Sequence, residues 1–207
     1  MSEIVLLERR RLPTGSIGAL ANGYWGIICF ILTEAALFTY LQFSYYYHAV
    51  QPHQGPWPPD GIPDIKLALP NTILLLASSF VVWWGEHGTK HGRRGQALAG
   101  LGIGFLMGVA FLAIQGLEWQ NKTFGLTSGP YASLFFTVTG FHMAHVAMGL
   151  FMLLAVTVWS FLGYFGPARS APVSIAAIYW HFVDAVWITV FFTFYLTPRL
   201  GLMWGAP

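Results

Sequence analysis

The sequence predicts an all-α, polytopic membrane protein: five transmembrane helices in one bundle, with residues 1–207 forming a single membrane domain. The first observation is the composition, which is 56% hydrophobic and only 9% charged, whereas soluble domains have about 25% charged residues. The second is that long apolar stretches separate the few charges, and about 20 apolar residues are enough to cross a bilayer. Lipid is therefore the expected solvent for most of the surface.

Five stretches meet the length requirement for a membrane span. They are nearly free of Asp, Glu, Lys and Arg, with Glu34 inside the first, Glu118 at the end of the third and Asp184 inside the last. We expect helices near residues 18–46, 67–85, 96–119, 131–163 and 172–197.

Each stretch has its own signals. The first is far longer than the 7–15-residue apolar core of a signal peptide, so we expect it to remain as a helix. The second is the shortest, and it follows an irregular loop, 51–66, that holds five prolines. The third and fifth have ordinary spanning lengths. The fourth is long enough to tilt or to project from the membrane.

The segment after the second stretch reads EHGTKHGRRG and contains two histidines four residues apart, His87 and His91. On a helix that spacing suits metal ligation. The interleaved glycines disfavour a helix, so we interpret the segment as a solvated loop.

The Lys and Arg residues predict the orientation. Seven fall on one side of the expected spans and three on the other. The seven are Arg9, Arg10, Arg11, Lys90, Arg93, Arg94 and Arg169, and the three are Lys66, Lys122 and Arg199. By the positive-inside rule the N-terminus is cytoplasmic and the C-terminus is outside. Because topology accounts for these charges, we expect no nucleic-acid partner.

The third stretch carries glycines at successive four-residue steps, Gly100, Gly104 and Gly108. Small residues on one face let another helix approach closely where lipid removes the hydrophobic driving force. We interpret the three as helix-packing residues.

Ionisable residues inside a membrane are expensive and mark candidate functional sites. Glu34 is either a proton-linked or partner-facing carboxyl, or a neutral acid bonded to a neighbouring helix. His181 and Asp184 are three residues apart and share a helix face, which suits either a structural polar pair or a proton relay. His142 with His145, and Gln115 with Glu118, share faces in the same way, and all these groups together suggest a common interior network.

The histidines allow a redox alternative. His142 or His145 facing His181 would suit a bis-histidine haem, which would make the chain a membrane cytochrome. A binuclear copper centre would need two cysteines, and only Cys29 is present. We expect no metal or other redox cofactor on this chain.

Four sequence blocks, in order, resemble subunit III of the haem–copper terminal oxidases, which include cytochrome c and quinol oxidases. They are GYWGIICFILTEAALF with Glu34, FLAIQGLEW with Gln115 and Glu118, TGFHMAHVAMG with His142 and His145, and YWHFVDAVWITVFFTFY with His181 and Asp184. The resemblance runs over nearly the whole chain beyond the first 20 residues. Glu34 matches the family's carbodiimide-reactive glutamate.

The resemblance implies an accessory, redox-inactive subunit that stabilises the catalytic subunit and supports proton uptake while the complex reduces oxygen and pumps protons. It implies haem and copper in partner subunits, bound phospholipid, and as partners subunit I, subunit II and a possible small subunit IV. Five helices match the shorter bacterial form, which lacks the first two of seven, and they imply the bacterial plasma membrane.

Two further alternatives stay open. A proton-coupled transporter would use Glu34 and the His181–Asp184 pair, although such proteins usually show internal repeats or broken helices, and neither is visible in the sequence. The accessory subunit of a nitric-oxide-reducing complex shares the expected fold.

Overall fold

The computed structural model describes residues 22–51, 57–59 and 61–200, and it is all-helical within these ranges. Five helices are long and apolar enough to cross a membrane. They are α2 (Asn22–Val50), α3 (Ala68–Lys90), α4 (Arg94–Gln120), α5 (Pro130–Phe161) and α6 (Ala171–Phe191), and α6 continues as the π-helix η2 (Phe192–Leu196). A 3₁₀ turn, η1 (Pro167–Arg169), precedes α6. The predicted class and the number of spans are confirmed.

The helix ends differ clearly from the predictions in three places, and the first is that the first helix continues past residue 46 to Val50. The second helix does not stop at Gly85 but continues to Lys90, so the prediction of a loop at Glu86–His91 is wrong. Gly85 and Gly88 do not break the helix because they are contact points with α4: a Cβ on either would lie 2.8 Å from α4 backbone nitrogen. The final turn of the fifth span is a π-helix, which the apolar pattern does not reveal. Predicted positions 18–21 lie outside the described residues.

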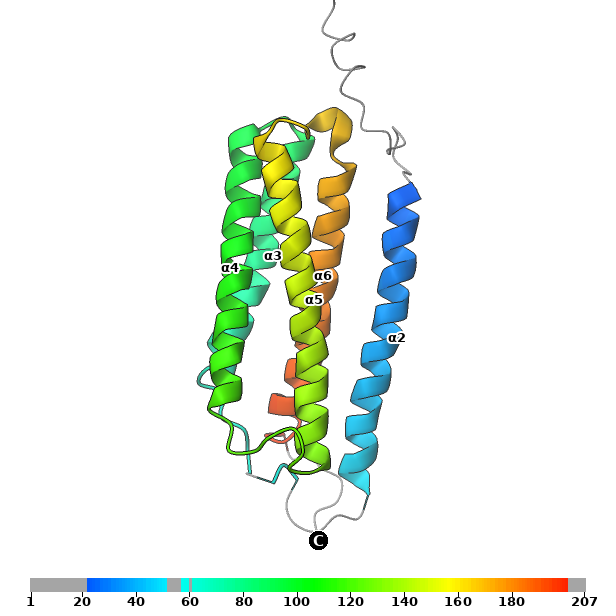
Figure 1. Cartoon of the computed structure of the whole chain (residues 1–207), viewed down its shortest axis with the longest axis vertical. Coiled ribbons are helices and arrows are strands. Elements are labelled where there is room, and N and C mark those ends of the chain that lie inside the picture. Colours follow the sequence, from blue (N-terminus) through cyan, green and yellow to red (C-terminus); the bar gives the residue numbers. More distant parts are fainter. Residues whose placement is uncertain (1–21, 52–56, 60, 201–207) are drawn as a thin grey trace, which may run out of the picture.

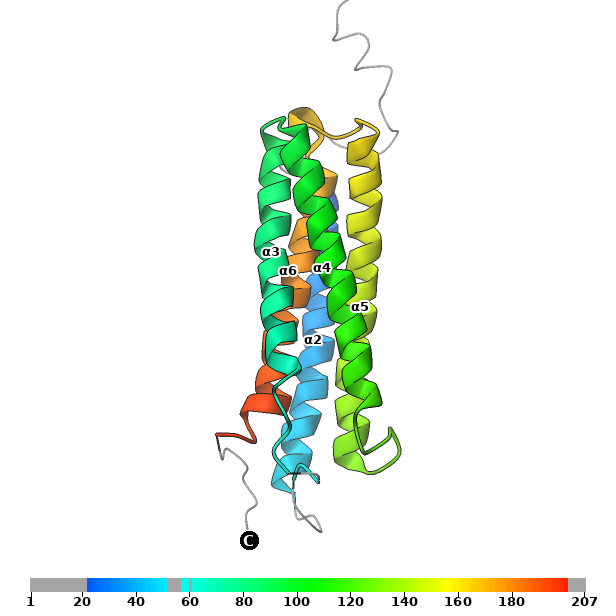
Figure 2. The ribbon, with the colours of Figure 1, turned by 90° about the vertical axis from the view of Figure 1, so that its left-hand side faces the viewer.

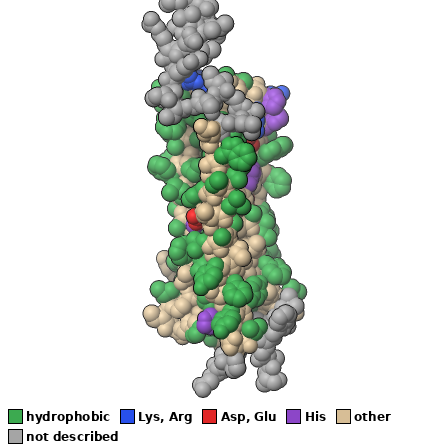
Figure 3. Space-filling model, turned by 90° about the vertical axis from the view of Figure 1, so that its right-hand side faces the viewer, with side chains coloured by type: hydrophobic (Ala, Val, Ile, Leu, Met, Phe, Trp, Pro, Cys, Tyr) green, Lys and Arg blue, Asp and Glu red, His purple; other side chains and the backbone are tan. Residues whose placement is uncertain are grey.

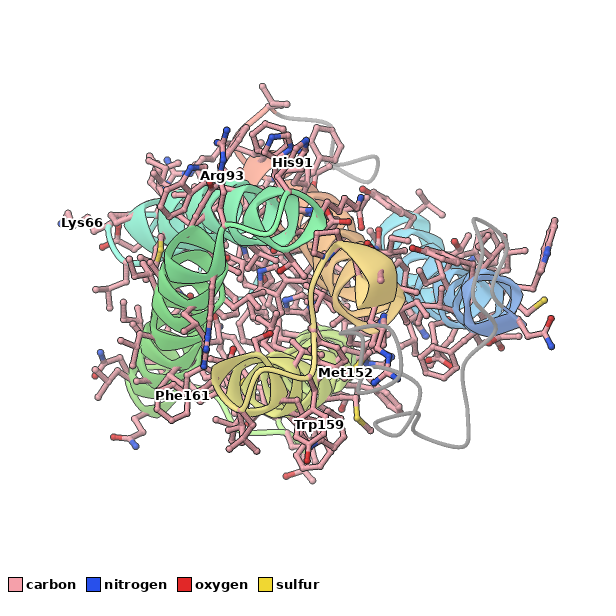
Figure 4. All side chains as sticks on the ribbon, turned by 90° about the horizontal axis from the view of Figure 1, so that it is seen from above. Lys66, His91, Arg93, Met152, Trp159 and Phe161 are labelled. Carbon is pink, nitrogen blue, oxygen red and sulfur yellow. The ribbon has the colours of Figure 1, made fainter. Side chains whose placement is uncertain are left out.

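Helices α3, α4, α5 and α6 surround a shared interior, whereas α2 lies outside this group against α5 and α6 (Figures 1, 2 and 4). In the most apolar part of α2 only 11% of the residues are buried, compared with 56% in the last span. The last span is therefore the central element, and its Trp180 and Trp187 are fully buried.

The glycines of α4 lie where neighbouring helices approach. A Cβ on Gly100 would come 2.4 Å from Cα of Gly85, and one on Gly104 would come 2.4 Å from Val82 Cγ2. A Cβ on Gly108 would meet the Trp180 ring at 2.5 Å. Glycine thus lets α3 and α4 pack almost backbone to backbone.

The outer surface fits a lipid environment. Figure 3 shows hydrophobic side chains along the length of one face, with the coloured Lys and Arg side chains near one end. Lys90, Arg93, Arg94 and Arg169 lie at the end of the bundle where α3 and α4 are joined, which we call the basic end; Lys122 lies at the other, which we call the far end. The candidate polar residues lie between these ends.

Candidate functional site

The first polar group joins α2 to α5. Oε2 of Glu34 lies 2.9 Å from Nε2 of His145, and both side chains are largely buried. Nδ1 of His145 lies 2.7 Å from the carbonyl oxygen of Phe141. Because a carbonyl can only accept, Nδ1 carries a hydrogen and donates it.

This geometry allows Glu34 and His145 to share one proton. With Nδ1 already protonated, the 2.9 Å contact holds a single proton, either on the carboxyl group or on Nε2. Both arrangements give a pair with no net charge, which reduces the cost of placing two ionisable groups inside a membrane. The pair can therefore shift a proton between α2 and α5 without creating net charge.

The second group joins α6 to α3 through a serine. The Ser79 hydroxyl donates to Oδ2 of Asp184, and Nδ1 of His181 lies 3.0 Å from the same hydroxyl oxygen. Since that hydroxyl hydrogen is directed to Asp184, His181 donates to Ser79. The histidine and the aspartate thus share a face, as their spacing predicts, but Ser79 bridges them.

The third group lies toward the far end of the bundle. Oε1 of Glu118 accepts from Lys122 Nζ at 3.0 Å and from the Tyr195 hydroxyl. The Glu118 side chain is 6% exposed and that of Lys122 is 16% exposed. An ion pair this buried depends on both partners, because removing one leaves an uncompensated charge.

His142 lies apart from these groups, whereas Gln115 lies beside Tyr195 of the third group. Both Gln115 and His142 are fully buried, and neither side chain makes a hydrogen bond of normal geometry among the described residues. The His142 ring packs against Trp187, with 4.8 Å between ring centroids, and against Phe111 at 5.9 Å. Among the described residues, the hydrogen bonds therefore place the predicted polar side chains in separate groups and do not join them in one network.

Further polar contacts connect α2 to the last span. Gln42 Nε2 donates to the Thr189 hydroxyl at 2.7 Å, and the Tyr46 hydroxyl lies 3.1 Å from that of Thr193. A groove of about 510 Å³ runs beside these contacts. Its walls are mainly apolar and include Phe38, Phe43, Phe182 and Val186.

The hydrogen bonds disfavour His145 as a haem ligand. Both ring nitrogens of His145 have protein partners, and Nδ1 of His181 is used by Ser79. Across residues 22–51, 57–59 and 61–200, no three His, Cys, Asp or Glu side chains gather in a way that could hold a metal ion. At the basic end, the rings of His87 and His91 are 4.0 Å apart, and Nδ1 of His91 is bonded to the His87 carbonyl.

The predicted site residues did not include Ser79, Lys122 or Tyr195. Lys122 follows Glu118 by four residues, the spacing of a helical ion pair, so this partner could have been found. Ser79 is one of two adjacent serines in a mainly apolar span, which is a weaker signal. Tyr195 lies in the π-helix, where the ordinary helical period no longer predicts which residues share a face.

Comparison with known proteins gives one consistent family. The family described as cytochrome c oxidase subunit III matches residues 18–198. Among the relatives, a cytochrome c oxidase subunit 3 from Synechocystis is 38% identical over 83% of this chain and 74% of its own length. One from Pylaiella littoralis is 36% identical over 82% of this chain and 65% of its own length. One from Scyliorhinus canicula is 34% identical over 83% of this chain and 68% of its own length.

The matched region contains all five spans and every polar residue described above. It covers about two thirds of the length of most of these relatives. From the family match and the all-helical membrane fold together, the chain belongs to the cytochrome c oxidase subunit III family.

Proposed function

We propose that this chain is an accessory, redox-inactive subunit of a respiratory haem–copper oxidase that reduces oxygen to water and pumps protons. The observation that carries the proposal is the match of residues 18–198 to subunit III. The chain contributes to an enzyme without holding its redox centre; haem and copper belong to partner subunits. Subunit I is the main partner, with subunit II and a small subunit IV as further ones.

The proposed role of the polar groups is to support proton uptake by the complex. The Glu34–His145 contact can move one proton without a change in net charge, and Ser79 offers a bridge between His181 and Asp184. Glu86, near the basic end of α3, forms an ion pair of 2.6 Å with Lys90. These groups extend from the basic end, which we assign to the cytoplasm, to the buried Asp184.

The proposed lipid site is the groove between α2 and α6. Its apolar walls suit an acyl chain, while Gln42 and Thr189 add polar atoms along one side. A phospholipid there would fill the space between α2 and the other helices. We propose that the subunit stabilises the complex in part through this lipid, in a bacterial plasma membrane.

Purification in mild detergent tests the proposal. A tagged chain should bring with it a large subunit with haem absorbance and oxygen-consuming activity, and the separated chain should be colourless. Reduction of nitric oxide in place of oxygen by the purified complex would favour the nitric-oxide-reducing alternative. A colourless polypeptide that purifies alone would contradict the proposal and favour a transporter.

A further inference from the structure

Three helices bring buried polar atoms without partners to one level of the four-helix group. Asn71 on α3, Gln115 on α4 and His142 on α5 are each fully buried. Five of their side-chain atoms have no hydrogen-bond partner among the described residues: Asn71 Oδ1, Gln115 Oε1 and Nε2, and His142 Nδ1 and Nε2. Buried polar groups in folded proteins are nearly always paired with protein or with ordered water.

The packing of the helices puts Asn71 beside Gln115. Nδ2 of Asn71 donates to the carbonyl oxygen of Phe111 at 3.3 Å. Gln115 follows Phe111 by one helical turn and lies on the same buried face of α4. The amide of Asn71 therefore lies next to the turn of α4 that leads to Gln115.

The register between α4 and α5 puts Gln115 level with the turn that carries His142. On one side of that level, the rings of Phe111 and His142 are 5.9 Å apart. On the other, the Trp119 ring lies where a Cβ on Gly140 would meet it at 3.4 Å. Gln115 is one turn from Phe111 and one turn from Trp119, so it faces this part of α5.

The hydroxyl and indole hydrogens near these side chains are already donated to other partners. Nε1 of Trp187 donates to the Thr72 hydroxyl at 2.9 Å, and that hydroxyl donates to the Ala68 carbonyl. The Thr139 hydroxyl donates to its own helix, at the carbonyl of Phe135. The hydroxyl hydrogen of Tyr195 is directed to Glu118, while its oxygen lies near the Gln115 amide and can accept from it.

The chemistry of the five atoms selects a ligand. The two carbonyl oxygens accept, the Gln115 NH₂ group donates, and a neutral imidazole provides one donor and one acceptor. A metal cation would need acceptors only, and an anion would need donors only. A small neutral molecule that both donates and accepts satisfies the mixture, and water does so with about three hydrogen bonds per molecule.

We infer that Asn71, Gln115 and His142 form a buried water-binding site that links α3, α4 and α5. The bound water completes the hydrogen bonding of the three side chains. It also connects α5 to α4, which otherwise meet at this level through the rings of His142 and Phe111. The site is independent of the proposed role in an oxidase, because it follows from the packing of this chain alone.

The first test is a density map of the intact complex at a resolution that shows ordered water. We expect at least one solvent peak about 2.7–3.2 Å from a ring nitrogen of His142 and from Gln115 or Asn71. A direct bond between His142 and Gln115 with no solvent peak overturns the inference. Density that fits a larger molecule or a metal ion also overturns it.

A variant pair supplies the second test. The double variant Gln115→Leu, His142→Phe should lose the solvent peak and the infrared O–D stretching band of buried water. Thr157→Val is the matched control, because the Thr157 hydroxyl bonds only to the Leu153 carbonyl of its own helix; it should keep both signals. Persistence of both signals in the double variant would contradict the site. If the double variant fails to fold, the map of the unaltered complex still decides.

Discussion

The carboxyl group of Glu34 and the ring of His145 meet at 2.9 Å near the middle of α2 and α5. This contact crosses the gap between the least buried helix and the four-helix group. The Phe141 carbonyl holds the hydrogen of Nδ1, so Nε2 needs a donor when the imidazole is neutral. Because of this requirement, we expect two substitutions of Glu34 to differ in their effect on stability.

Glu34→Gln should preserve the attachment of α2, because the amide NH₂ can donate to Nε2 of His145. Glu34→Leu leaves that nitrogen unpaired and should lower the free energy of unfolding by about 1–3 kcal/mol. Thermal denaturation of the purified complex in detergent measures both. Equal losses for the two variants would show that His145 does not need a donor from α2.

Ser79→Ala should weaken the contact between α3 and α6. Removing the hydroxyl leaves Asp184 without its donor and His181 Nδ1 without its acceptor, at a cost of about 1–3 kcal/mol for buried groups. Ser79→Thr keeps the hydroxyl and serves as the control. A melting temperature unchanged by Ser79→Ala would mean that the bridge contributes nothing to stability.

Gly100→Ala should destabilise the α3–α4 contact, because its Cβ would lie 2.4 Å from Cα of Gly85, where only backbone movement relieves the clash. We expect a loss of roughly 1–3 kcal/mol, typical of overpacking. Gly102 on the same helix has open space, with no atom within 4 Å of an added Cβ. Gly102→Ala should therefore be neutral or stabilising by up to about 1 kcal/mol, and unfolding in a denaturing detergent compares the two.

Two ion pairs with the same four-residue spacing should respond differently to loss of their lysine. Lys122 is 16% exposed and pairs with the buried Glu118, whereas Lys90 is 46% exposed and pairs with Glu86. Lys122→Met should cost on the order of 3 kcal/mol, because a buried carboxylate loses its counter-ion. Lys90→Met should cost under about 1 kcal/mol. Similar melting temperatures for both variants would show that Glu118 is neutral or hydrated.

The orientation can be measured with introduced cysteines after Cys29→Ser. Gly125 lies in the α4–α5 connection at the far end, and Gly166 lies just before η1 at the basic end. The positive-inside rule predicts that Gly125→Cys reacts with a membrane-impermeant thiol reagent in intact cells and that Gly166→Cys reacts only after permeabilisation. The opposite pattern would reverse the predicted topology.

The five spans could be predicted because backbone groups in lipid must be bonded within their own segment, which leaves helices as the form for apolar stretches of this length. The spacing of His181 and Asp184 correctly placed them on one helix face. It could not identify Ser79, because that contact depends on the rotation of α3 relative to α6, which no local pattern encodes. For the same reason, the sequence could not show that Glu34 and His145 form a pair apart from the other polar groups.

The loop predicted around Gly85 and Gly88 was wrong because glycine was taken as a helix breaker. In water a helical glycine lowers the stability of a helix through backbone entropy, and that argument led to a predicted loop. In this bundle the missing side chains allow α3 and α4 to touch, and the contact outweighs the local penalty. The available signal was the small residues Ala97 and Gly100 on α4, which meet Gly88 and Gly85 on α3, and it required the two helices to be compared together.

The close contact between α3 and α4 also bears on biogenesis. Only three residues, His91 to Arg93, separate the two helices. The closest contacts between them lie near that connection, where Gly88 meets Ala97 and Gly85 meets Gly100. In the two-stage scheme, helices first insert and then associate, so neighbours with a short connection can pair while the rest of the chain is still being synthesised. We expect this hairpin to form first in the nascent chain and to provide the surface on which α5 and α6 assemble.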